Sequence, residues 1–426
     1  MLPVSRTFLS SWRCFPNLTF NWKTIGFNLD EDTYETAKKF KEYMARIYHI
    51  FENHSGTGVK TLELNLRPWG NDFTASHLDI WLQTAVKSGI LELVVNLPDD
   101  HSPKYNFRCL LLSCAASSIQ TLSLASAFRP TLMIGCLRNL KSLYLRLEFE
   151  ISDCNEITSS LKIPSYLQRL SILRVRRCER LEVIEIYAPK VTSFVFIGPP
   201  TKISIVDSSQ LETVVMNGST YSGMFRYAVT KLYSFASNLH TLVLFSYGEA
   251  INSTPGSAHK FLQLRHLKIY FDGRKFHSSF DFLSMVSFLE ACPVLETFFL
   301  SAGSRFRGRQ EPTLKDTDAD SWHIKRIPGF RHDKLKKVSI TGVQSTKSLI
   351  ELACQILESC SSLRCLVLDT TSGYDDRSMC ENLGWEDVME ALKGFKAIKR
   401  HLKGKVPSSV ELTVLKPCDR CHMSTL

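Results

Sequence analysis

A six-residue unit of the form apolar-x-x-apolar-x-apolar recurs along nearly the whole chain. One copy reads Ile119-Gln-Thr-Leu122-Ser-Leu124. Because successive side chains of a strand point to opposite faces, Leu122 and Leu124 project to one face of a short strand and Ser123 to the other. Copies begin at Val59, Ile90, Ile119, Leu140, Leu170, Leu181, Val191, Leu211, Leu239, Leu264, Leu295, Leu335 and Leu363. The pattern predicts one short strand for each copy.

A single strand of this kind cannot bury its apolar edge alone. Stacking many of them in parallel joins the inward Leu, Ile, Val and Phe side chains into one continuous core. The repeat therefore predicts an α/β fold, a leucine-rich repeat solenoid. We expect parallel strands on its concave face, and helices and helix-free turns on its convex face.

The spacing of the copies predicts where the helices lie. Between Leu170 and Val191 the copies begin about 10 residues apart, which is room for a strand and a turn but not for a helix. A shortened copy follows at Lys202–Ile205. We therefore expect residues 181–217 to be free of helix.

Longer intervals between copies predict helices on the outer face. After Ser76, a residue type that caps helix N-termini, apolar residues recur at helical spacing. Its stripe comprises Leu78, Trp81, Leu82, Ala85 and Val86, and similar segments are 223–235, 282–291 and 345–358. Trp385 to Lys405 begins acidic and ends basic, which suits a helix macrodipole, and 410–414 alternates like a closing strand. Residues 302–333 are polar and irregular, which predicts an insertion.

Composition excludes disorder, and the cysteines indicate a reducing compartment. Hydrophobic residues are 44% and charged residues 22% of 426, with a net charge of +10 that permits an acidic partner without requiring one. The 13 cysteines are an odd number and mostly isolated in apolar runs, which favours the cytoplasm, the nucleus or both. The uncharged stretch Cys109 to Phe128 is rich in Ser, Thr and Gln, so we interpret it as a short helix and a strand rather than a membrane span.

Motifs for enzymatic chemistry are absent from the sequence. It contains no G-x-S-x-G, G-x-G-x-x-G, G-x-x-x-x-G-K-[ST] or H-E-x-x-H motif, so we expect neither an enzyme nor a bound cofactor. Cys418-Asp-Arg-Cys421-His422 matches a haem-attachment pattern or half of a zinc site. Zinc needs about four ligands and there is no second Cys-x-x-Cys pair. We interpret residues 416–426 as a tail, with zinc binding as the alternative.

Basic and aromatic residues suggest two binding surfaces. Arg305, Arg307 and Arg309 flank Phe306, a mixture that could hold RNA, but a solvated loop is the simpler interpretation and no nucleic acid is expected. Aromatic and arginine residues also anchor protein interfaces. The candidate protein-binding residues of the concave face are Tyr144, Arg146, Arg174, Arg176, Glu185, Tyr187, His266, Lys268 and Tyr270. The alternative is an ordinary solvated sheet face.

The two ends of the repeat array carry a family resemblance. Val4-Ser-Arg-Thr-Phe8-Leu9-Ser-Ser-Trp12 looks like the tail of an F-box, and His332-Asp-Lys-Leu335 with the following helix and strand is similar to the carboxy-terminal module called FBD. The chain resembles plant F-box proteins with leucine-rich repeats. The resemblance implies an F-box remnant (1–20), a solenoid (21–330), an FBD-like cap (331–415) and a tail (416–426).

The resemblance also implies a function and exposes a departure. Such proteins are non-catalytic substrate-recognition subunits of SCF-type, cullin-RING E3 ubiquitin ligases, which bind a target protein and a Skp1-type adaptor. Family members begin with a Leu-Pro-x-Asp/Glu segment and two further helices, whereas this sequence begins with the last helix. Either the front of the F-box is missing from the sequence, or the protein is an adaptor-independent scaffold. The candidate adaptor-binding residues are Val4, Phe8, Leu9 and Trp12.

Overall fold

The computed structural model divides the chain into two compact units. Unit 1 comprises residues 1–197 and 201–210, and unit 2 comprises residues 198–200 and 211–426. Within them the structure describes residues 14–21, 23–25, 36–54, 58–66, 75–86, 89–97, 118–125, 137–146, 160–176, 181–207, 209–218, 223–247, 260–272, 281–302, 324–343, 347–371, 385–402 and 404–417.

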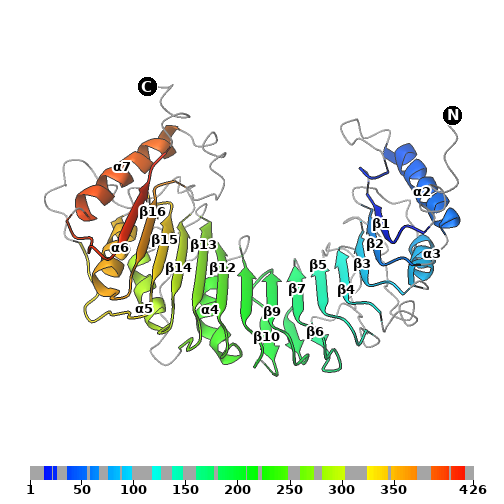
Figure 1. The fold of residues 1–426 in the computed structure, drawn as a ribbon, viewed down its shortest axis with the longest axis horizontal. Coiled ribbons are helices and arrows are strands. Elements are labelled where there is room, and N and C mark those ends of the chain that lie inside the picture. The colour runs from blue at the N-terminus through cyan, green and yellow to red at the C-terminus, as the bar shows by residue number, and fades with distance from the viewer. Residues whose placement is uncertain are drawn as a thin grey trace. The chain divides into compact units, whose positions relative to one another are not determined.

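Unit 1 contains a parallel sheet whose strands come from copies of the six-residue repeat (Figure 1). Its neighbouring strands, in order, are β1 (Asn17–Phe20), β2 (Thr61–Asn65), β3 (Glu92–Asn96), β4 (Thr121–Ala125), β5 (Ser142–Arg146), β7 (Ile172–Arg176) and β9 (Ser193–Ile197). Along β4, Leu122 and Leu124 are buried and Ser123 is half-buried. The predicted parallel strands and their inward apolar ladder are confirmed.

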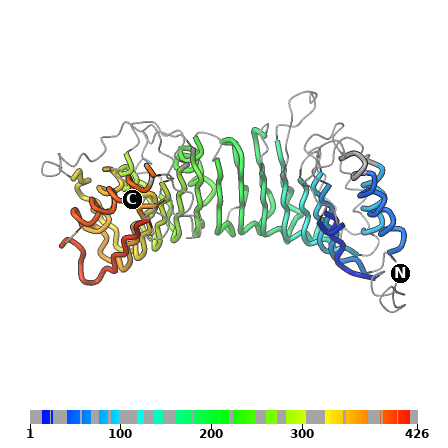
Figure 2. The backbone as a smooth tube through the Cα atoms, turned by 90° about the horizontal axis from the view of Figure 1, so that it is seen from above, coloured from blue at the N-terminus to red at the C-terminus, as the bar shows by residue number. Residues whose placement is uncertain are grey.

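A second, three-stranded parallel sheet lies in unit 1. Its strands are β6 (Ser160–Ile163), β8 (Val183–Ile186) and β10 (Lys202–Ile205), with β8 in the centre. The copy that begins at Leu181 therefore gives a strand of this second sheet, not of the main one. Closely spaced copies alternate between the two sheets because each coil of about 20 residues places one strand in each, as the coils in Figure 2 illustrate. In the described part of 181–217, strands and turns alternate without a helix, as predicted.

Two helices pack together in unit 1. The predicted helix is α3 (Ala75–Val86), whereas α2 (Thr36–Asn53) was not predicted. Trp81 of α3 is fully buried, and its ring stacks on Phe51 of α2 with ring centroids 5.9 Å apart and an interplanar angle of 6°. The Tyr43 hydroxyl donates a hydrogen bond of 3.0 Å to the Asn65 carbonyl oxygen. These contacts fix α2 to the sheet of unit 1.

Unit 2 contains a second run of parallel strands. In order they are β11 (Thr213–Asn217), β12 (Thr241–Tyr247), β13 (His266–Asp272), β14 (Thr297–Ala302), β15 (Lys337–Thr341), β16 (Cys365–Asp369) and β17 (Glu411–Leu415). The predicted helices are confirmed as α4 (Met224–Lys231), α5 (Met285–Glu290), α6 (Lys347–Ser359) and α7 (Trp385–Leu402). Phe225 of α4 contacts Phe271 of β13 and Phe288 of α5, at centroid distances of 5.6 and 5.7 Å. Helices thus bury one face of this sheet.

The structural units divide the chain differently from the sequence-based domains. Strands β15, β16 and β17 continue the sheet of unit 2 through residue 415. The division near residues 197–211 therefore does not coincide with the predicted boundary at 330. The F-box remnant and the FBD-like cap stay predictions.

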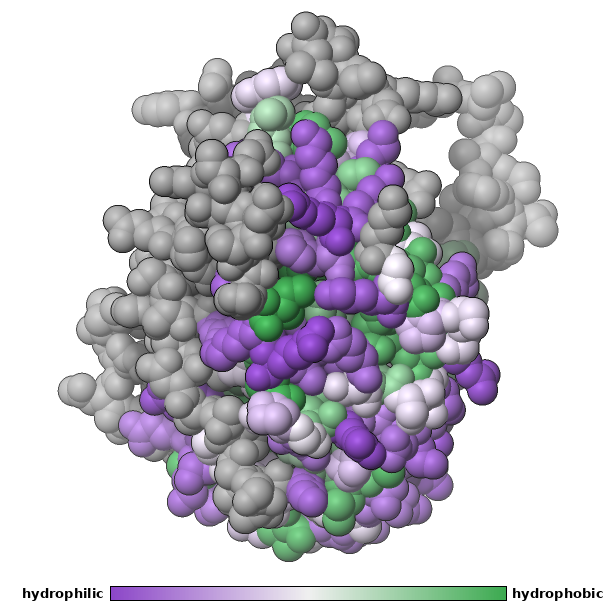
Figure 3. Space-filling view, turned by 90° about the vertical axis from the view of Figure 1, so that its left-hand side faces the viewer, coloured by the Kyte–Doolittle hydropathy of each residue, from purple (hydrophilic) through white to green (hydrophobic). Residues whose placement is uncertain are grey.

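The last strand and last helix of unit 2 are less covered than the rest. On the side that carries them, Figure 3 shows mainly hydrophilic residues with hydrophobic patches between them. Trp385 and Met389 of α7 are 49% and 37% exposed. Leu412 and Val414 of β17 are half-buried, whereas the equivalent leucines of β16 are buried. Among the described residues, the core of unit 2 is therefore thinnest at β17.

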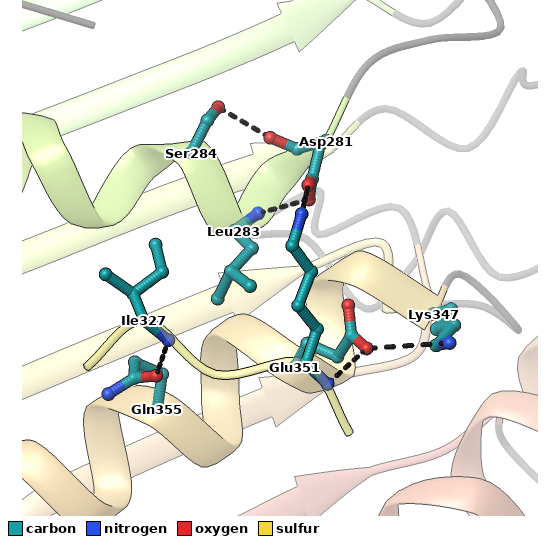
Figure 4. A network of polar contacts seen from close by, with 8 residues as sticks. Asp281, Leu283, Ser284, Ile327, Lys347, Glu351 and Gln355 are labelled. Carbon is teal, nitrogen blue, oxygen red and sulfur yellow. Dashed lines mark hydrogen bonds and ion pairs between the residues drawn. The ribbon is translucent and has the colours of Figure 1, made fainter. Parts of the chain in front are cut away.

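Part of the predicted insertion, 302–333, is firmly docked. Ala302 ends β14, residues 303–323 lie outside the described part of the chain, and residues 324–332 pack against α6. The Lys325 amide donates to Glu351 Oε1 and the Ile327 amide to Gln355 Oε1, both at 2.8 Å (Figure 4). Buried side chains of α6 thus bind the main chain of a segment that the sequence alone marks as irregular.

Glu351 gives this docked segment a pH dependence. Its carboxylate is 4% exposed and 3.7 Å from Lys347 Nζ, and burial raises the pKa of Glu351 above its usual 4.5. A raised pKa means that the folded state holds the proton more tightly than the unfolded state, so this contribution to stability is present at low pH and is lost as pH rises through the raised pKa. We expect the unfolding free energy of the wild type, relative to Glu351→Gln, to fall as pH rises above 4.5.

Urea unfolding of both proteins between pH 4 and pH 8 checks this expectation. Gln355→Glu places a second carboxylate one helical turn from Glu351, and it should steepen the fall of the unfolding free energy with rising pH. A wild-type-minus-variant difference that stays constant with pH would contradict the assignment.

Candidate functional site

The open face of the unit 1 sheet, formed by residues between the buried positions, is the candidate site. Parallel register aligns its positions in three rows across β2, β3, β4, β5 and β7, the first of which holds Thr61, Glu92, Thr121, Ser142 and Ile172. The other two rows are Glu63, Val94, Ser123, Tyr144 and Arg174, and Asn65, Asn96, Ala125, Arg146 and Arg176. These two rows change from acidic or neutral residues at β2 to arginine at β7. The sheet therefore places its positive charge at one side of this face.

A hollow of about 400 Å³ lies on this face. It is lined by Asn65, Asn96, Ser123, Leu124, Ala125, Tyr144, Leu145, Arg174 and Arg176. Ser123 and Ala125 have small side chains, so β4 leaves space between the asparagines and the larger side chains of β5 and β7. No carboxylate is among these lining residues, all of which the structure describes.

Tyr144 and Arg174 form a stacked pair at the hollow. The guanidinium carbon of Arg174 lies 4.9 Å from the centroid of the Tyr144 ring, a distance typical of a cation–π contact. Arg174 Nε is buried and has no hydrogen-bond partner among the described residues. Tyr144 thus holds a guanidinium that no described carboxylate neutralises.

Unit 2 presents an aromatic cluster on the open face of its own sheet. Tyr270 stacks on Phe245, with centroids 4.4 Å apart and planes 7° apart, and it also contacts Phe299 at 5.1 Å. His266 Nδ1 lies 2.8 Å from Thr297 Oγ1, and Lys268 is exposed. His266, Lys268 and Tyr270 were predicted from the sequence, whereas Phe245 and Phe299 were not, although both lie at outward positions of their repeats.

Comparison with known proteins identifies the repeat. A family model described as the At1g61320/AtMIF1 LRR domain matches residues 50–147 and 146–419. The chain belongs to this leucine-rich-repeat family. It is also 27% identical, over 170 residues or 40% of its length, to an FBD-associated F-box protein of Arabidopsis thaliana, At5g56560. That match spans 36% of the relative's length. Family and relative together support a protein-interaction role.

The leucine-rich-repeat fold places two predicted site residues away from the open face. Glu185 belongs to β8 and Tyr187 follows it, so both lie on the second sheet of unit 1. Glu185 there pairs with Lys162 of β6 at 3.0 Å, and Tyr187 is 39% exposed. This corrects the expectation that they share a face with Arg174. The reason is the alternation of closely spaced copies between the sheets.

Of the remaining residues singled out from the sequence, the structure describes the position of Arg146 but not the other clusters. Arg146 lies opposite Arg176 in register. The candidate adaptor residues Val4, Phe8, Leu9 and Trp12, the cluster Arg305–Arg309, and Cys418, Cys421 and His422 lie outside the described residues.

The described residues show neither an ionised cysteine among the buried thiols Cys354 and Cys360 nor a group of metal ligands. Burial raises the pKa of Cys354 to about 11 and that of Cys360 to about 12, so both remain thiols at neutral pH. The described residues contain no group of three or more His, Cys, Asp or Glu side chains placed to hold a metal ion. None of the described helices is both long and apolar enough to cross a membrane.

Proposed function

We propose that this leucine-rich-repeat protein is the substrate-recognition subunit of an SCF-type E3 ubiquitin ligase. Its open sheet face would hold a target protein, and its amino-terminal segment would hold a Skp1-type adaptor. No chemistry is required of the chain itself, because ubiquitin transfer is carried out by other subunits. The observation that carries the proposal is the joint match to a leucine-rich-repeat family and to a relative named as an F-box protein.

The character of the open face supports target binding. Tyr144, Arg174, Tyr270 and Phe299 lie on open sheet faces and are of the types that anchor protein interfaces. Solenoids of parallel strands commonly bind partners through the extended surface that their repeats create. A partner could therefore contact several repeats at once.

Binding of a Skp1-type adaptor tests the proposal. We expect the purified full chain to co-elute with the adaptor in size-exclusion chromatography. Phe8→Asp and Leu9→Asp should each weaken that association at least about tenfold, because a charge in an apolar helix interface is costly. Val206→Asp is the matched control, since Val206 is an apolar residue, 66% exposed, that directly follows β10.

The second candidate function is an adaptor-independent scaffold. The family model that matches most of the chain describes a leucine-rich-repeat domain, and a repeat domain can bind a partner through its repeats without an adaptor. Absence of co-elution with the adaptor, or equal weakening by Val206→Asp and Phe8→Asp, would contradict the ligase role. Either result would favour the scaffold.

A further inference from the structure

The hollow of unit 1 is lined by positively charged and neutral side chains. Its charged lining residues are Arg174 and Arg176, and its other polar lining residues are neutral. Arg174 makes no hydrogen bond or ion pair within the described part of the chain. An arginine that pairs with no carboxylate of the described residues favours anion binding, because guanidinium pairs strongly with carboxylate and phosphate.

Arg174 is pre-positioned for a two-pronged contact. Its Nε is buried, and its guanidinium carbon lies over the Tyr144 ring. A cation–π contact of this kind uses none of the guanidinium N–H groups as hydrogen-bond donors to a protein oxygen. Unlike Nε, the two Nη groups are not buried without a partner, and no hydrogen bond to a described residue uses them. They can therefore donate two parallel hydrogen bonds to one carboxylate.

The neutral part of the hollow complements a peptide. Asn65 and Asn96 occupy adjacent positions at the ends of β2 and β3. Amide side chains donate and accept hydrogen bonds, as peptide groups do. From β2 to β7 the face crosses four strand intervals, which at about 4.8 Å each span about 19 Å, the length of about six extended residues.

We propose that this hollow binds an extended, acidic segment of a partner protein, with a carboxylate of that segment paired to Arg174. The inference deepens the proposed function and rests on the open face being the protein-binding surface. The asparagines contact the backbone of the segment. Specificity arises because a lysine or arginine at the same point of the peptide would meet the like charge of Arg174.

Selection from random peptides tests the chemistry without knowledge of the partner. The probe is a phage-displayed library of seven-residue peptides, selected on the purified full chain. We expect the enriched peptides to share an Asp or Glu at one position. One of them, labelled with fluorescein, then reports affinity by anisotropy beside a copy in which Gln or Asn replaces that acid.

Variants separate pairing geometry from charge. Arg174→Gln should weaken binding of the acidic peptide at least about tenfold, and Arg174→Lys by about fivefold or more, because lysine keeps the charge but lacks the planar fork. Arg169→Gln removes the same charge at an exposed residue that does not line the hollow, and it should change affinity less than about twofold. Thermal unfolding of each variant establishes that it is folded.

Several outcomes would overturn the inference. These are no enriched peptide, equal binding of the amide copy, an effect of Arg169→Gln as large as that of Arg174→Gln, or retained affinity in Arg174→Lys. Displacement of the peptide by excess inorganic phosphate but not by acetate would assign the hollow to phosphoryl groups and also overturn it.

The result is separable from the fate of the proposed function. Enrichment of peptides without an acid, bound through other open-face residues, would reject the inference and keep the protein-binding role. Acidic peptides bound through Arg174, together with no adaptor binding, would keep the inference and reject the ligase role.

Discussion

Gly342→Ala is expected to destabilise unit 2 by about 3–5 kcal/mol, the sum of a strained backbone and a steric overlap. Gly342 has φ of +77°, a conformation that residues with a Cβ rarely adopt. A Cβ built at this position would overlap the Ala302 carbonyl oxygen, which belongs to the main chain and cannot move aside cheaply. Hydrogen exchange of β14, β15 and β16 measures the loss, with β2 to β4 of unit 1 as an internal reference.

Gly404→Ala separates the two causes of this destabilisation. Gly404 has φ of +78°, almost the value at Gly342, but a Cβ there would meet no atom within 4 Å. Gly404→Ala should therefore destabilise the fold only through the strained positive φ, by about 1–2 kcal/mol. Equal effects of the two alanine variants would show that the close approach to Ala302 does not limit stability.

Trp81→Ala is expected to destabilise unit 1 by about 3–5 kcal/mol, the usual range for loss of a large buried aromatic side chain. Trp81 is 0% exposed and packs against Phe51 and Tyr48 of α2, at centroid distances of 5.9 and 5.5 Å. Its removal leaves a cavity between α2 and α3. Faster exchange at α2 amides and a lower urea midpoint are the expected measurements.

Trp385→Ala is the matched control for that substitution. Trp385 is 49% exposed at the start of α7, so its removal loses about half the buried surface lost at Trp81 and should cost only about 1–2 kcal/mol. If Trp81→Ala were no more damaging than Trp385→Ala, the α2–α3 contact would not be part of the folding core of unit 1.

The strands were predictable because the spacing of apolar residues within each copy is enough to indicate a strand. In Leu239-His-Thr-Leu242-Val-Leu244 the apolar spacing alone sets which residues face inward, and all three leucines are buried in β12 and the turn before it. Helix α6 was equally readable from its apolar stripe. Local periodicity suffices where every copy must bury the same face.

The candidate site was only half predictable. Arg174 and Tyr144 were found because an outward Arg or Tyr between two core residues is visible in the sequence. Their stacking, and the small Ser123 and Ala125 that open the hollow, depend on which strands become neighbours. A one-dimensional pattern gives the face of a residue but not its partner across strands.

The repeat, the inward ladder of apolar side chains and the helices α3 to α7 follow from local sequence patterns. The place of Glu185 on a second sheet, the packing of α2 on α3 and the docking of residues 324–332 on α6 appear only in the folded chain. These three features depend on contacts between residues that are distant in sequence. Side-chain alternation is fixed by the local backbone, whereas sheet membership and docking depend on hydrogen bonds and buried contacts between residues far apart in the chain.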